Sequence, residues 1–119
     1  MSHVTNCILC FSVMEDDMAC IREVDAFFET TGRPQGFEKT LSQHASDGLR
    51  AFGGTKALET NIAVAAFNHL NLRELCQWMT THVHWQCPTD VQLFVCDQED
   101  DRFTLLGWDE LTKRAEGGE

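Results

Sequence analysis

Two stretches of the chain share one pattern, an apolar run followed by a segment of helical periodicity. Residues Val4–Val13 are nearly all apolar or small, and apolar positions recur at helical spacing over 16–31. Leu58–Asn68 is a second apolar run, and a second helical pattern covers 72–83. Apolar runs of this kind are typical of strands that are covered on both faces. The pattern therefore predicts two strand–helix units of similar length.

Both predicted helices have start signals and an apolar stripe. Glu15–Asp17 places carboxylates at the positive end of the first helix, which ends before Gly32 and Pro34. Asn71 is expected to cap the second helix. The side chains expected to be buried are Met18, Ile21, Val24 and Phe28 in the first helix and Leu72, Leu75, Met79 and Val83 in the second.

Three shorter strands complete the expected layout. Residues 36–43 alternate in polarity as an edge strand does, whereas 91–96 and 102–106 flank an acidic turn at 97–101. The order strand–helix–strand–strand–helix–strand, plus one C-terminal strand, predicts an α+β fold. It is the ferredoxin-like, split βαβ arrangement, an antiparallel sheet with two helices on one face.

The length of 119 residues predicts one domain, 1–114, followed by a frayed tail at 115–119. Because the central strands are apolar on both sides, the sheet face without helices needs a cover. Two covers are consistent with the sequence. One is a homodimer made by stacking sheets, which we favour, and the other is the final segment with Trp108.

Charge restricts the classes of partner. The formal net charge is −10, with −5 in residues 1–31, +1 in 32–89 and −6 in 90–119. Nucleic acids and anionic membranes bind cationic surfaces, so neither is an expected partner, whereas a basic protein is. No apolar stretch reaches the roughly 20 residues of a membrane span, and a signal peptide is not expected. We predict a cytoplasmic protein.

The six cysteines lie mostly within apolar runs, which favours reduced core thiols over a disulfide framework. Cys7-x-x-Cys10 has a redox spacing, but in a strand its two side chains point to opposite faces. His82-x-His84-x-x-Cys87 supplies good zinc ligands without an evident fourth one. We therefore expect no metal site, no cofactor and no catalytic residue.

Two segments are candidate binding sites. The turn Asp97–Asp101 lacks the ligand pattern of a calcium loop, and Glu99, Asp100 and Asp101 are the expected contacts to a basic partner. The alternative is a solvated hairpin turn. Arg50, Gly53, Gly54 and Lys56 form a locally positive, glycine-rich stretch that would bind an anion or small ligand, although it lacks the P-loop pattern. The alternative there is a flexible loop entering a strand.

These observations predict a small acidic interaction protein that binds a basic partner, as a regulator or inhibitor rather than a catalyst. The alternative is a small-ligand-binding domain or enzyme with an apolar pocket between sheet and helices. Small residues at Ala63 and Ala65 would leave room for such a pocket.

Overall fold

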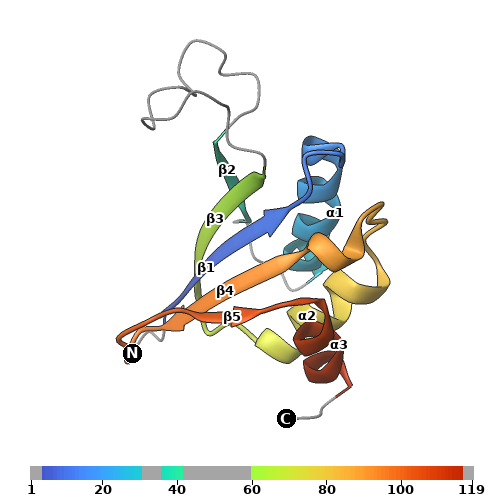
Figure 1. Cartoon of the computed structure of the whole chain (residues 1–119). Helices are drawn as coiled ribbons and strands as arrows, with labels where there is room; N and C mark the ends of the chain where they lie inside the picture. Colours follow the sequence, from blue (N-terminus) through green and yellow to red (C-terminus); the bar gives the residue numbers. More distant parts are fainter. Residues whose placement is uncertain (1–3, 31–35, 42–59, 117–119) are drawn as a thin grey trace.

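The computed structural model describes residues 4–30, 36–41 and 60–116 (Figure 1). Within these ranges the chain has an α+β fold, an antiparallel sheet with three α-helices. The elements are β1 (Val4–Phe11), α1 (Asp17–Thr30), β2 (Glu38–Leu41), β3 (Asn61–Asn68), α2 (Leu72–Thr81), the 3-10 turn η2 (Pro88–Asp90), β4 (Gln92–Asp97), β5 (Thr104–Leu106) and α3 (Trp108–Ala115).

The strands form one sheet in the order β2-β3-β1-β4-β5, and every neighbouring pair is antiparallel. The expected order of elements is therefore confirmed over the described residues. The second central strand begins at Asn61, and residues 58–59 of the predicted strand lie outside the described part. The expected strand over 36–43 is shorter, because β2 covers only 38–41 and residues 42–43 are not described.

Strand alternation divides the sheet into two faces. In β1, Cys7, Leu9 and Phe11 are buried, whereas Ile8 and Cys10 are only half-buried. The buried set faces the helices and meets their apolar stripes in one core, where the Phe28 ring stacks on that of Phe67 with centroids 4.3 Å apart. The most completely buried members of this core include Leu9, Val24, Ala63, Leu75, Cys76, Met79, Val91, Leu93 and Leu111.

All three α-helices lie on the same side of the sheet (Figure 1). The last helix, α3, packs next to α2, and its residue Leu111 is fully buried in the shared core. Trp108 also packs against this core. The expectation that the Trp108 segment covers the opposite face is therefore wrong, because the single apolar stripe of α3 is already used against α2.

The expected start of α2 is confirmed, whereas one side chain of α1 that was expected to be buried is exposed. Asn71 Oδ1 accepts the backbone N–H of Glu74 at 3.2 Å, so the predicted cap of α2 is confirmed. Met18 was expected in the buried stripe of α1, but its exposed fraction is 59%. It lies in the first turn of a helix that starts at Asp17, ahead of the buried positions Cys20 and Ile21. Among the described residues, no helix has the length and apolarity that a membrane crossing requires.

Candidate functional site

The acidic segment between β4 and β5 is an ordered turn at the tip of a hairpin. The backbone N–H of Asp100 donates to the carbonyl oxygen of Asp97 at 2.8 Å. In return, the N–H of Asp97 donates to Asp100 Oδ2 at 3.1 Å. These two reciprocal hydrogen bonds close the turn and fix the course of its backbone.

Two further bonds tie this turn to the central strand β1. The backbone N–H of Val4 donates to Gln98 Oε1 at 2.9 Å, and the hydroxyl of Thr5 donates to Asp97 Oδ1 at 2.7 Å. Thr5 is buried, so this second bond joins the hairpin tip to the interior of the sheet. The turn is thus supported from two strands.

The carboxylates that were expected to bind a partner lie together at this tip. Glu99, Asp100 and Asp101 are all exposed. Asp101 has an ion pair with Arg102 at 3.8 Å, but the two side chains are 92% and 85% exposed, so water screens the pair almost completely. The acidic turn (Glu99–Asp101) therefore presents a concentrated negative charge to solvent.

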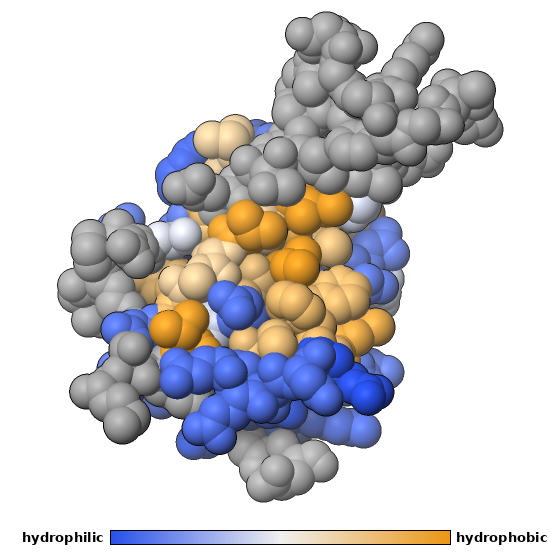
Figure 2. Space-filling view, turned by 90° about the vertical axis from the view of Figure 1, so that its left-hand side faces the viewer, coloured by the Kyte–Doolittle hydropathy of each residue, from blue (hydrophilic) through white to orange (hydrophobic). Residues whose placement is uncertain are grey.

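An apolar surface begins directly beside the acidic turn. The sequence analysis did not identify this surface. Phe103 and Leu105 are 43% and 49% exposed, and Leu105 pairs across the sheet with the half-buried Phe94. Seen from the side opposite the helices, the sheet carries a hydrophobic patch bordered by hydrophilic residues (Figure 2). The sequence contains a signal for this surface, because the apolar residues Phe103 and Leu105 alternate with the polar residue Thr104.

The second candidate site has no counterpart in the described part of the structure. Arg50, Gly53, Gly54 and Lys56 all fall in 42–59, outside the described residues. The prediction that they bind an anion stays a prediction.

The histidines and the cysteine with zinc-like spacing have separate contacts. The His82 ring stacks on Trp78 with centroids 4.0 Å apart, whereas His84 Nδ1 lies 3.2 Å from Glu23 Oε2. Among the described residues, no group of three or more His, Cys, Asp or Glu side chains is arranged to hold a metal ion.

Glu15 has a structural role that its sequence position did not reveal. It is 7% exposed, and its carboxylate accepts the backbone N–H groups of Gln86 and Cys87 at 2.9 and 2.8 Å. The Cys20 thiol lies 3.7 Å from the same carboxylate. Glu15 was expected to open the first helix with its neighbours. Instead it binds the segment before β4, and Asp16 Oδ1 accepts the N–H of Ala19 at the helix start.

The buried thiols are poor nucleophiles. Burial raises the pKa of Cys7 and of Cys20 to about 12, and that of Cys76 to about 11. A thiol attacks only as thiolate, so these groups are unreactive at neutral pH. Cys7 and Cys10 lie on opposite faces of β1 as expected, and all six cysteines are free.

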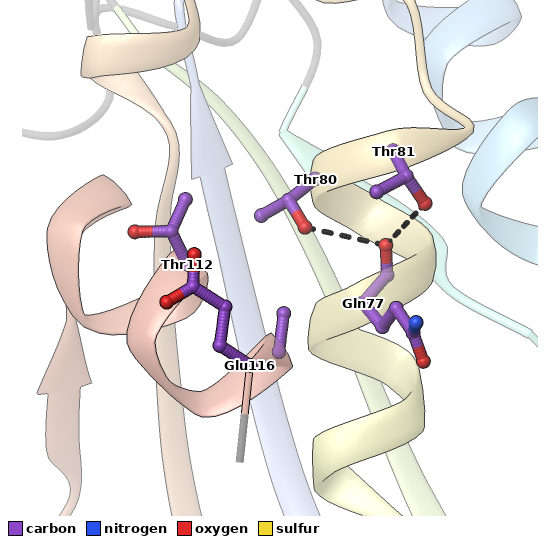
Figure 3. A pocket seen from close by; sticks show the side chains of 6 residues that line it. Gln77, Thr80, Thr81, Thr112 and Glu116 are labelled. Atoms are coloured by element: carbon purple, nitrogen blue, oxygen red, sulfur yellow. Dashed lines mark hydrogen bonds between the residues drawn. The ribbon is translucent and has the colours of Figure 1, made fainter. Parts of the chain in front are cut away.

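Two shallow cavities lie beside α3, on the side of the helices. One cavity, of about 260 Å³, lies between α2 and the C-terminal end of α3 and is lined by Gln77, Thr80, Thr81, Thr112, Ala115 and Glu116. The Thr81 hydroxyl donates to the Gln77 carbonyl oxygen at 2.6 Å (Figure 3). The Thr80 hydroxyl lies 2.9 Å from the Cys76 carbonyl oxygen and 3.2 Å from that of Gln77. Both of these hydroxyl donors are therefore engaged by the backbone of α2. The other, of about 300 Å³, lies between β5 and α3.

No protein-family model, curated protein or solved structure matches this chain.

Proposed function

We propose that the protein is a small acidic interaction protein whose acidic turn binds a basic partner, as a regulator or inhibitor rather than a catalyst. The observation that carries the proposal is the ordered, exposed tip held by Asp97 and tied to β1 through Thr5. Carboxylates on a rigid support lose little conformational freedom on binding. Their field also steers a cationic partner toward the tip and raises the association rate.

The strand order and the shared side of the helices support the ferredoxin-like, split βαβ arrangement as the fold of this protein. In that arrangement β5 is an addition after the last core strand, and the acidic turn lies on the hairpin that this addition creates. The proposed binding site would therefore lie on the β4–β5 hairpin, which the ferredoxin-like arrangement itself does not contain.

The burial of Ala63 favours an interaction protein over a ligand-binding domain or enzyme. A pocket between sheet and helices was expected to open at Ala63 and Ala65. Ala63 is 0% exposed within the core, and Ala65 packs against that core. The space at the centre of this layer is therefore filled by the chain's own side chains.

Binding of a lysine- and arginine-rich peptide tests the proposal. We expect the variant Glu99→Gln/Asp100→Asn/Asp101→Asn to bind about tenfold more weakly, since three exposed charge contacts of at most about 1 kcal/mol each are lost. Binding of the natural protein should also weaken steeply with salt. Isothermal titration calorimetry measures both effects. Asn at position 100 keeps an acceptor for the Asp97 N–H, so the turn is retained.

The matched control changes the same total charge elsewhere. Glu29→Gln/Glu74→Gln/Asp90→Asn neutralises three exposed carboxylates outside the turn. We expect this control to bind within about twofold of the natural protein, because surface charges beyond a Debye length are largely screened. Equal losses in the two variants would show that net charge, rather than the acidic turn, attracts the peptide.

A further inference from the structure

The sheet face opposite the helices has an apolar row that crosses four strands. Ile8 in β1 pairs with Val64 on one side and with Phe94 on the other, and Phe94 pairs with Leu105 in β5. Paired residues of an antiparallel sheet point to the same face. The row Val64–Ile8–Phe94–Leu105 is therefore one continuous stripe of aliphatic and aromatic side chains.

The rows on either side of this stripe carry no charge. Cys10 lies between Ile62 and Gln92, and Asn6 lies between Ala66 and Cys96. Together with the stripe, these rows define the open face, the surface of β3, β1, β4 and β5 that points away from the helices. Figure 2 shows it as a hydrophobic patch. Within the described part of the chain, the three α-helices pack on the other side.

We propose that the open face binds a second copy of this chain, with the two sheets stacked face to face. Stacked sheets pack about 10 Å apart through interdigitated side chains of the kind that the stripe supplies. Within β3, β1, β4 and β5 these rows contain no charge for a basic partner to pair with, and the nearest charged position in the stripe's row is on β2, where Glu38 pairs with Val64. A second copy instead offers the same uncharged, apolar surface in return, as a two-fold interface requires.

The area of the open face fits a weak dimer. The strands β1, β3, β4 and β5 contain 8, 8, 6 and 3 residues. At about 3.3 Å per residue and about 4.8 Å between strands, they cover about 400 Å² per copy. Two copies would bury about 800 Å², the size of weak and transient interfaces, so we expect a dissociation constant between micromolar and millimolar.

The acidic turn selects the orientation of the two copies. A two-fold axis parallel to the strands would place both acidic turns at the same end, where they repel. An axis across the strands places them at opposite ends, about 26 Å apart, which exceeds the Debye length of about 8 Å at physiological salt. We therefore expect β1 to run over β1 in the opposite direction, with Cys10 of one copy above Asn6 of the other.

The dimer would present one acidic turn at each end. If the proposed function holds, each dimer has two sites for a basic partner, and linked sites raise the overall affinity for a multivalent partner. The dimer itself does not rest on that function, because its interface contains none of the turn's carboxylates.

Analytical ultracentrifugation of the full chain tests this inference. The natural protein should move from the 13.5 kDa mass of one chain toward twice that mass as its concentration rises from micromolar to millimolar. Ile8→Glu would bury a charge at the centre of the interface, and we expect it to weaken association at least about 100-fold. Leu105→Glu serves as the second variant, because this side chain is 49% exposed in the single chain and tolerates a charge without unfolding.

The matched control is Met18→Glu, which adds the same charge at a 59% exposed apolar side chain on α1. It should associate as the natural protein does. A natural protein that keeps the mass of one chain at every concentration overturns the inference. So does a dimer that Ile8→Glu and Leu105→Glu both leave intact. If the protein stays single and Ile8→Glu instead abolishes peptide binding, the open face belongs to the basic partner.

Discussion

The two faces of the sheet are made by the same strands, yet within the described part of the chain the helices cover only one of them. Leu9 is 0% exposed beneath the helices, whereas its neighbour Ile8 is half-buried on the open face. Both are large aliphatic side chains in the middle of the central strand. The difference shows that local sequence gives a strand two apolar faces, and that the helices determine which of them becomes core.

Polar groups follow the same division. Near the helix-covered face, Thr5 bonds to Asp97 and Glu15 bonds to the backbone before β4. The buried Asn61 donates its side-chain amide to the Ser12 carbonyl oxygen at 3.0 Å, while its Oδ1 has no hydrogen-bond partner. The open face has uncharged residues at its centre, and the exposed carboxylates of the acidic turn lie beyond its end. The helix-covered face thus forms the core, and we propose that the other face makes contacts with a second copy.

The largest effect expected from this comparison is in a pair of alanine variants. Leu9→Ala should lower the free energy of unfolding by about 3–4 kcal/mol, because it leaves a cavity in a fully packed core. Ile8→Ala should cost no more than about 1 kcal/mol in the single chain, because the side chain is already partly solvated. Urea denaturation at low protein concentration measures both.

Protein concentration sharpens the same comparison. If a second copy covers the open face, the cost of Ile8→Ala grows as the protein is concentrated, since dimerisation adds stability by mass action. The cost of Leu9→Ala should stay constant. Equal costs for both variants at low concentration would contradict the difference in burial between the two faces.

An intermediate loss of stability is expected when the Glu15 carboxylate is removed. Glu15→Ala leaves the N–H groups of Gln86 and Cys87 without their acceptor, which should cost about 2–3 kcal/mol of unfolding free energy. The matched control, Glu29→Ala, removes an exposed carboxylate and should change stability by less than about 0.5 kcal/mol. Thermal or urea unfolding compares them. A Glu15→Ala protein as stable as the control would mean that water replaces the lost acceptor.

Much of the fold could be predicted because periodicity reports on local structure. The apolar run over Val4–Phe11 indicated a strand, and it forms β1. The helical spacing of Ile21, Val24 and Phe28 indicated which side chains of the first helix are buried, and the structure buries all three. The cap at Asn71 and the hairpin after β4 were predicted from side chains that act on their own neighbourhood. Such signals need no knowledge of distant contacts.

What could not be predicted depends on partners far along the chain. Glu15 reads as a helix-opening carboxylate, and its contacts with Gln86 and Cys87, 71 and 72 residues away, leave no local pattern. Whether the segment with Trp108 could cover the open face likewise depended on where α3 packs, and no local pattern shows that. The acidic turn was visible as composition, whereas its anchoring by Val4 and Thr5 required the pairing of β1 with β4.

The smallest effect is a pH dependence on the helix side of the molecule. The backbone N–H of His84 donates to Glu23 Oε1 at 2.8 Å, and this bond holds the pKa of Glu23 below its ordinary value of 4.5. The folded state therefore binds fewer protons than the unfolded state. Glu23 contributes stability above the unfolded pKa and loses it as the pH falls through the folded pKa.

Glu23→Gln isolates this contribution, because the amide keeps an acceptor for the N–H and cannot be ionised. We expect the natural protein to be more stable than the variant at about pH 6 and this advantage to shrink as the pH falls below the unfolded pKa and through the lower folded pKa. The advantage should stay below about 1 kcal/mol, since the Glu23 side chain is 38% exposed and solvent screens it. Unfolding free energies across this pH range measure it. Changes on the open face, such as Leu105→Ala, should leave the pH profile unmoved, and an advantage that grows toward low pH would contradict the lowered pKa.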